Sequence, residues 1–167
     1  MNHVAVRQAS SNDLKQIEQL LESASLPTLG VADHVHHFLV AEKEGTIVGA
    51  IGLEVYGETA LLRSAVVTPD LQGQGIGSLL YDHNLTQAHK LGVKRLILLT
   101  NTAEEYFARK GFKKIDQKSI TGPITSSVEF SGACPAHAAC MELMLDTNTQ
   151  SSVFPAPIAT PQTDSKD

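Results

Sequence analysis

One segment in the middle of the chain, VVTPDLQGQGIG at residues 66–77, constrains the fold more than any other feature. An apolar strand ends at Val67, and Pro69 prevents its continuation because proline cannot donate a hydrogen bond to a strand ladder. Three glycines then lead into residues 75–91, whose apolar side chains recur with the period of a helix. The chain must therefore pass from a strand into a helix through a turn with little side-chain cover.

This turn has the properties of an anion-binding site. Backbone N–H groups at the start of a helix point outward unpaired, and the helix dipole favours negative charge there. Glycines leave no Cβ between those N–H groups and a bulky anion such as a pyrophosphate. The spacing G-x-G-x-G is not the dinucleotide fingerprint, and the G-K-[ST] of a Walker A loop is absent. On these residues alone, a tight strand-to-helix connection stays open as an alternative.

Hydrophobic periodicity divides the rest of the chain into alternating strands and helices. Strands are predicted at 4–9, 38–42, 46–56, 59–67, 95–100, 112–117 and 139–145, and helices at 12–24, 75–91 and 102–110. The segment before the second strand, up to residue 36, fits either a loop or a short helix. Tight turns join the strands at 38–67, so we expect an antiparallel meander there. The sequence therefore predicts an α/β fold with one mixed sheet.

Charge and hydropathy exclude several classes of partner. The net charge is −5 and no basic cluster occurs, which argues against nucleic-acid binding. No apolar run approaches the roughly 18 residues that a membrane span requires. The N-terminus lacks the apolar stretch of a signal peptide, so we expect a cytoplasmic protein.

The C-terminal part differs in composition from the rest. Residues 146–167 are rich in Thr, Ser, Pro and Ala and show no periodicity, so we predict a domain at 1–145 followed by a mobile tail. A segment that docks on a partner subunit is the alternative, and a homodimer is considered. The spacing of Cys134, His137 and Cys140 is not a common zinc pattern, so we expect ordinary thiols and no metal.

Two motifs together resemble the GNAT superfamily of N-acetyltransferases. QGQGIG at 72–77 matches the family motif Q/R-x-x-G-x-G/A, and AEEYFARKGF at 103–112 resembles the family signature A-x-x-F-Y-x-x-x-G-F. The order of elements agrees over residues 4–145. The resemblance implies a GNAT-type mixed, largely antiparallel sheet flanked by helices. Its central strands are expected to splay apart and admit acetyl-CoA as co-substrate.

The resemblance also implies where the coenzyme binds. The backbone of Val66 and Val67 is expected to pair with pantetheine. The pyrophosphate is expected on the N–H groups of Gln72, Gly73, Gln74, Gly75, Ile76 and Gly77. The family often has a tyrosine at the position of Phe107, where it protonates the departing thiolate. Phe107 has no proton to give, so we take it as a coenzyme contact. Tyr106, expected to point into the core, or a water molecule then serves as the acid.

Two ionisable residues in apolar strands are candidates for the acceptor site. Amine acetylation needs a base, and Glu54 in GLEVY is the candidate. Arg63 in LLRSAVV could clamp an anionic group of the acceptor by bidentate pairing. The alternative for Glu54 is a solvated charge on an edge strand. The alternatives for Arg63 are a position at the surface and an ion pair with Glu54.

A narrower resemblance suggests the acceptor. Glu54, LRS at 62–64, VEF at 128–130, Cys134-Pro135 and ACM at 139–141 look like the GNAT enzymes of arsenic-resistance operons. Those enzymes resemble amino-acid N-acetyltransferases with glutamate-like substrates, and members of the group acetylate arsinothricin, a glutamate mimic. We therefore predict transfer of acetyl to the primary amine of a small amino-acid-like molecule, arsinothricin among them. The alternatives are a glutamate-type enzyme unrelated to arsenic, an enzyme acting on protein N-termini, and a non-catalytic acyl-CoA-binding domain.

Overall fold

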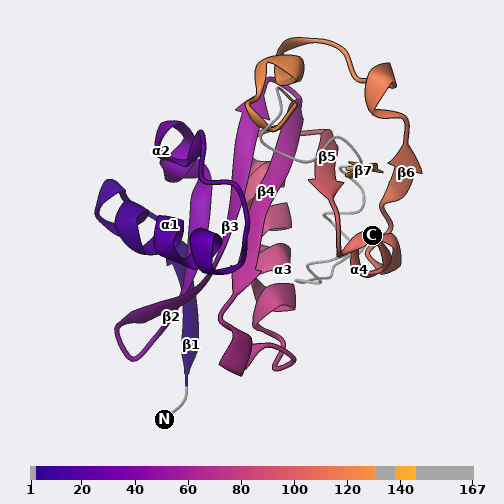
Figure 1. Cartoon of the computed structure of the whole chain (residues 1–167). Coiled ribbons are helices and arrows are strands. Elements are labelled where there is room, and N and C mark those ends of the chain that lie inside the picture. The colour runs from indigo at the N-terminus through magenta and orange to yellow at the C-terminus, as the bar shows by residue number, and fades with distance from the viewer. Residues whose placement is uncertain (1–2, 131–137, 146–167) are drawn as a thin grey trace, which may run out of the picture.

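The computed structural model describes residues 3–130 and 138–145. Within these residues, seven strands form one mixed sheet with helices on both faces (Figure 1). The strands are β1 (Val4–Gln8), β2 (Phe38–Lys43), β3 (Thr46–Tyr56), β4 (Thr59–Val67), β5 (Arg95–Thr100), β6 (Lys113–Ile115) and β7 (Ala139–Met144). The helices are α1 (Leu14–Ser23), α2 (Val31–His34), α3 (Ile76–Lys90) and α4 (Glu104–Arg109). The predicted tail and Cys134 lie outside the described residues, and the homodimer stays a prediction.

The strands follow the order β1-β2-β3-β4-β5-β7-β6 across the sheet. Neighbours are antiparallel except β4 and β5, which run parallel. The predicted fold class, a mixed and largely antiparallel α/β sheet, is confirmed. No helix in the described part of the chain has the length and apolar character needed to cross a membrane.

The last predicted strand pair differs from expectation in one respect. The strand predicted at 112–117 is confined to β6, because Phe112 is buried in the core and a 3-10 turn begins at Gln117. Asp116 stabilises that turn by accepting a hydrogen bond from the backbone N–H of Lys118 at 3.0 Å. The strand therefore ends early for a local reason, a side-chain cap that competes with the ladder.

Alternating residues of β2 and β3 explain the two helical layers. Val40 and Ala50 pack in one core with α1. Their chain neighbours Leu39 and Ile51 pack in a second core with α3. Successive side chains of a strand point to opposite faces, so these central strands are apolar on both sides.

The ambiguous segment before β2 folds as helical turns. Gly30 has φ 83°, a left-handed conformation that glycine adopts without strain, and α2 begins directly after it. A 3-10 turn at Val35–His37 then leads into β2. The consequence for the site is that α2 brings His34 close to β3.

The centre of the sheet is irregular on both sides of β4. Pairing with β5 is limited to Thr59–Leu61 opposite Arg95–Ile97, and the two strands separate beyond it. On the other side, Arg63 pairs with Gly52 and Val66 pairs with Ala50. Two residues of β4, Ser64 and Ala65, therefore lie opposite one residue of β3, as in a β-bulge.

Candidate active site

A cavity of about 720 Å³ lies where β4 and β5 separate. The glycine turn before α3 lines one end of it. Val66 and Val67 line its wall, and Leu26, Arg63 and Ser64 line the other end. The described structure thus brings most of the predicted coenzyme residues and Arg63 to the same cavity. Gln74, Ile76 and Glu54 are not among the residues that line it.

The glycine turn leaves its backbone open. Gly73 and Gly75 have φ 83° and 88°, and nothing lies within 4 Å of the place where a Cβ would stand on either. Gly75 is the N-cap of α3, and no side chain caps that helix end. The first N–H groups of α3 are therefore available to an anion.

The other residues predicted for this turn divide into two groups. Gln72 and Gly77 line the cavity, and the Gln72 side-chain amide donates to the Val67 carbonyl at 3.0 Å. Ile76 directs its side chain into the core, where it is 6% exposed. Gln74 is exposed. Neither side chain lines the cavity, and the binding of an anion by the backbone N–H groups of Gln74 and Ile76 stays a prediction.

Tyr106 and Phe107 differ in how deeply they are buried. Phe107 is buried, with its ring centroid 5.5 Å from that of Phe112 and 6.3 Å from that of Tyr81. Tyr106 is half-buried, and its hydroxyl lies 3.2 Å from Ser78 Oγ at the start of α3. Both tyrosine and phenylalanine line the cavity. Phe107 belongs to the buried aromatic cluster with Tyr81 and Phe112, while Tyr106 packs against the same core partly buried, so its expected position in the core is met only in part. The roles of Phe107 as a coenzyme contact and of Tyr106 as the acid stay predictions.

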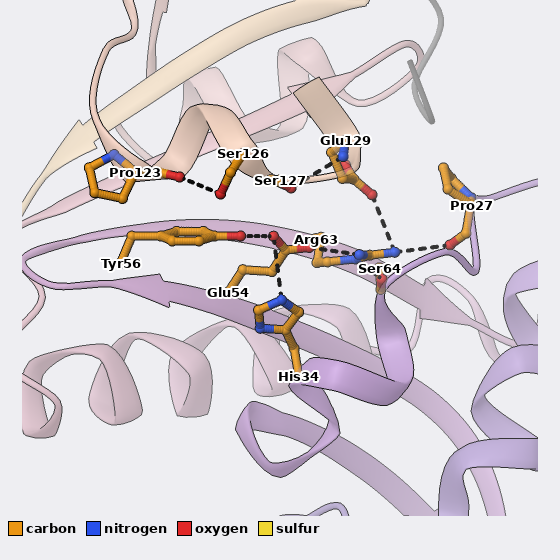
Figure 2. A network of polar contacts seen from close by, with 10 residues as sticks. All are labelled: Pro27, His34, Glu54, Tyr56, Arg63, Ser64, Pro123, Ser126, Ser127 and Glu129. Carbon is orange, nitrogen blue, oxygen red and sulfur yellow. Dashed lines mark hydrogen bonds and ion pairs between the residues drawn. The ribbon is translucent and has the colours of Figure 1, made fainter. Parts of the chain in front are cut away.

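At the opposite end of the cavity, Arg63 is the centre of a polar network (Figure 2). Its Nη1 lies 2.7 Å from Glu54 Oε2, and its Nη2 lies 3.4 Å from Glu129 Oε2. Nη2 also donates to the Pro27 carbonyl at 3.3 Å, and Nε donates to Ser64 Oγ at 2.9 Å. The Arg63 side chain is 0% exposed. This is the ion pair with Glu54 that stood as an alternative for Arg63, and the bidentate clamp on the acceptor stays a prediction.

Glu54 is bonded through both carboxylate oxygens. Oε1 accepts the Tyr56 hydroxyl at 2.5 Å and lies 3.8 Å from His34 Nε2. Burial alone would raise the pKa of Glu54, but hydrogen bonds from Tyr56, Ser127 and Arg63, with the Arg63 charge, lower it overall. Burial and the bond to Glu54 raise the pKa of Tyr56 to about 12. The pair is therefore a carboxylate and a neutral phenol at neutral pH. A solvated edge charge, the alternative for Glu54, is wrong, because the residue is 1% exposed in an interior strand.

Sequence reasoning missed several members of this network. His34, Tyr56 and Ser127 were not predicted, and Glu129 was noted only within the narrower resemblance. Tyr56 alone carried a local signal, since it is two residues from Glu54 and shares its strand face. The others reach the site through the chain path of α2 and of a 3-10 turn at Pro123–Ser126, which periodicity does not reveal.

Of the two cysteines, the structure describes Cys140. Cys140 is a buried free thiol, and burial raises its pKa to about 11. Cys134 and His137 lie outside the described residues. Among the residues at 3–130 and 138–145, no group of His, Cys, Asp and Glu side chains could hold a metal ion.

Comparison with known proteins identifies the family. A family model described as an acetyltransferase (GNAT) domain matches residues 34–114. An amino-acid acetyltransferase of Mycobacterium tuberculosis is 33% identical over 131 residues, which cover 71% of this chain and 74% of the relative. An amino-acid acetyltransferase of Neisseria meningitidis serogroup A is 27% identical over 128 residues, covering 70% of this chain. The match spans only 29% of that longer Neisseria enzyme.

Solved structures share the fold. N-acetylglutamate synthase of Neisseria gonorrhoeae, complexed with coenzyme A and N-acetyl-glutamate, superposes with a TM-score of 0.73 at 23% identity. That match covers 87% of this chain and 36% of the synthase. A Mycobacterium tuberculosis protein in complex with CoA gives a TM-score of 0.71 at 26% identity, covering 85% of this chain and 99% of that one. The chain belongs to the GNAT family of acetyltransferases.

Proposed function

We propose that the chain transfers the acetyl group of acetyl-CoA to the amine of a glutamate-type amino acid. The observation that carries the proposal is the cavity between β4 and β5, which joins the open glycine turn to the Arg63–Ser64 end. The coenzyme phosphates would bind the N–H groups at the start of α3, and pantetheine would follow Val66 and Val67. The acyl group would then face the end lined by Leu26 and Ser64.

Glu54 is proposed to take the proton that the acceptor amine loses. It is ionised at neutral pH, and His34 Nε2 lies 3.8 Å from its Oε1. The His34 side chain is 25% exposed while that of Glu54 is 2% exposed, so His34 can pass a proton between Glu54 and solvent. A Glu54→Gln change is expected to lower kcat at neutral and alkaline pH alike, because Glu54 is already ionised there.

The departing thiolate needs a proton, and Tyr106 is the proposed donor, with water as the alternative. The support is that Tyr106 lines the cavity and has its hydroxyl beside Ser78. The Tyr106→Phe variant distinguishes between Tyr106 and water as the proton donor. A fall in kcat of about a hundredfold, the range of general acid catalysis, would support the tyrosine. Near-full turnover would assign the step to water.

The choice between glutamate and arsinothricin rests on the relatives. The named relatives are amino-acid acetyltransferases, and one structural neighbour is an N-acetylglutamate synthase. These names favour glutamate over an arsenical mimic as the first acceptor to test. The match covers only 29% of the Neisseria enzyme, so the acceptor of that enzyme does not by itself identify the acceptor of this chain. Glutamate is therefore proposed as the acceptor and has to be tested.

The test is product formation with a panel of acceptors. The purified chain is incubated with acetyl-CoA and, separately, with glutamate, glutamine, aspartate, arsinothricin, a lysine-containing peptide and buffer. Release of CoA and the mass of the acetylated product are measured. N-acetylglutamate formed faster than the other products is the expected result. Coenzyme binding without turnover on any amine would instead support a regulatory acyl-CoA-binding domain.

A further inference from the structure

Ser64 holds a backbone conformation that costs free energy. Its φ is 62°, in the left-handed region, although it stands within β4 and is not a glycine. For a residue with a Cβ, this region costs about 1–2 kcal/mol. Strain of this kind persists where the surroundings impose it, and it is concentrated at functional sites.

The hydroxyl of Ser64 is held by Arg63 (Figure 2). Arg63 Nε donates to Ser64 Oγ at 2.9 Å. The two other nitrogens of the guanidinium are anchored on Glu54, Glu129 and Pro27, so the direction of the Nε–H is fixed. The Nε–H occupies one lone pair of Oγ, and the hydroxyl proton is free to be donated elsewhere.

Ser64 is also placed to meet a bound molecule. It is half-buried, and it lines the cavity together with Leu26. It lies three residues before Val67, a distance of about 10 Å along the strand. A charged donor on Oγ polarises the O–H bond and makes it a stronger donor.

We propose that Ser64 is an acceptor-binding residue, whose Oγ–H donates to the anionic group of the amino-acid acceptor. Arg63 is then a positioning residue that acts on the acceptor through Ser64 instead of touching it. The inference rests on the proposed acetyl transfer to an amino acid. It explains how a guanidinium that is 0% exposed can still favour an anionic substrate.

The decisive variant is Ser64→Gly, which separates strain from function. Glycine adopts φ 62° freely, so the melting temperature should stay the same or rise. Loss of a hydrogen bond to a charged group should raise the acceptor KM about ten- to a hundredfold. The acetyl-CoA KM should stay within about twofold, because the phosphates bind elsewhere.

Ser25→Gly is the matched control. Ser25 has φ 59°, follows α1 and is exposed. Its replacement should relieve the same strain and leave both KM values unchanged. Ser64→Ala, which removes the hydroxyl but keeps a Cβ, should reproduce the acceptor defect without the gain in melting temperature.

Arg63→Lys tests the route through Ser64. Lysine keeps the charge but has no Nε–H at that position, so the acceptor KM should rise. In the Ser64→Gly background the same change should add little, because the two residues act as a unit. Additive effects, or an unchanged acceptor KM in folded Ser64→Gly, would overturn the proposal. A wild-type chain that acetylates no amino acid would refute the proposed function instead.

Discussion

The two ends of the cavity are built in opposite ways. At the end proposed for the coenzyme, one short segment, residues 72–77, offers its backbone N–H groups, and the space around Gly73 and Gly75 is open. At the end proposed for the acceptor, the groups are side chains and the Pro27 backbone carbonyl, from three segments separated in sequence, residues 27–34, 54–64 and 127–129. There the packing is tight. A Cβ on Gly30 would stand 3.1 Å from Arg63 Nη1 and 3.0 Å from Val128 Cγ2.

The difference fits the molecules proposed to bind at the two ends. A diphosphate is recognised by charge and by N–H groups, which any backbone supplies when glycines expose it. An amino-acid acceptor has to be distinguished from its analogues, and that requires fixed side chains with satisfied partners. We therefore expect the acceptor end to matter more for stability and the coenzyme end to matter mainly for binding.

The largest effect should come from Arg63→Met. This change leaves Glu54 and Glu129 buried beside an apolar side chain, and removing one partner of a buried ion pair costs about 3–5 kcal/mol of unfolding free energy. Urea unfolding at pH 7 measures it. The double variant with Glu54→Gln should recover part of the loss. A change below about 1 kcal/mol would show that the acceptor end is not a structural centre.

Next in size is the effect of Gly75→Val on coenzyme affinity. Gly75 has φ 88° at the N-cap of α3, and a β-branched side chain would stand where the phosphate approaches the backbone. Calorimetry should show acetyl-CoA binding weakened more than about tenfold. Gly45→Val is the matched control, since Gly45 has φ 80° in the turn between β2 and β3 with equally open space. Equal losses of acetyl-CoA affinity in both variants would contradict the proposal that the glycine turn at residues 72–77 binds the phosphates.

A smaller, pH-dependent effect is expected at the Arg7–Asp13 pair, which belongs to neither end. The hydrogen bond from Arg7 lowers the pKa of Asp13 to about 2, below its value in an unfolded chain. The carboxylate therefore stabilises the fold above about pH 4, and this contribution is lost as the pH falls towards 2. Because Arg7 is 39% exposed, we expect only about 1–2 kcal/mol.

Unfolding of Asp13→Asn as a function of pH checks this expectation. The variant should be less stable than the wild type at pH 7 and nearly equal to it near pH 2. Comparing its loss of unfolding free energy with that of Arg63→Met shows how much less a partly exposed ion pair contributes to stability than a buried one. A constant difference between the two proteins at all pH values would contradict the assigned pKa of Asp13.

The comparison of the two ends also shows what the sequence could predict. The glycine turn, the meander and the helix after it were predicted because their signals are local: glycine spacing, proline and hydrophobic period. Glu54 and Arg63 were recognised as unusual because charges are rare in apolar strands. Their partners His34 and Glu129 were not predictable, because His34 lies 20 residues before Glu54 and Glu129 lies 66 residues after Arg63, and no periodic pattern links them. The different burial of Tyr106 and Phe107 depends on how α4 packs beside α3, which one sequence does not define.

The smallest effect is expected at Asn84, where a substitution should raise the unfolding free energy instead of lowering it. Asn84 lies on α3 and is 0% exposed, and its amide has no hydrogen-bond partner within the described residues. Leucine has the same branched shape, so Asn84→Leu should raise the unfolding free energy by about 1 kcal/mol by removing a desolvated amide. Gln87 on the same helix is the matched control, because its side-chain amide donates to the His37 carbonyl at 3.0 Å. Gln87→Leu should therefore destabilise the fold, as loss of a satisfied group does in the acceptor network.

Urea unfolding compares the two variants, and acetyl-CoA affinity should be unchanged in Asn84→Leu. A destabilised Asn84→Leu protein would mean that buried polarity in α3 is satisfied, and the contrast with the acceptor end would then disappear.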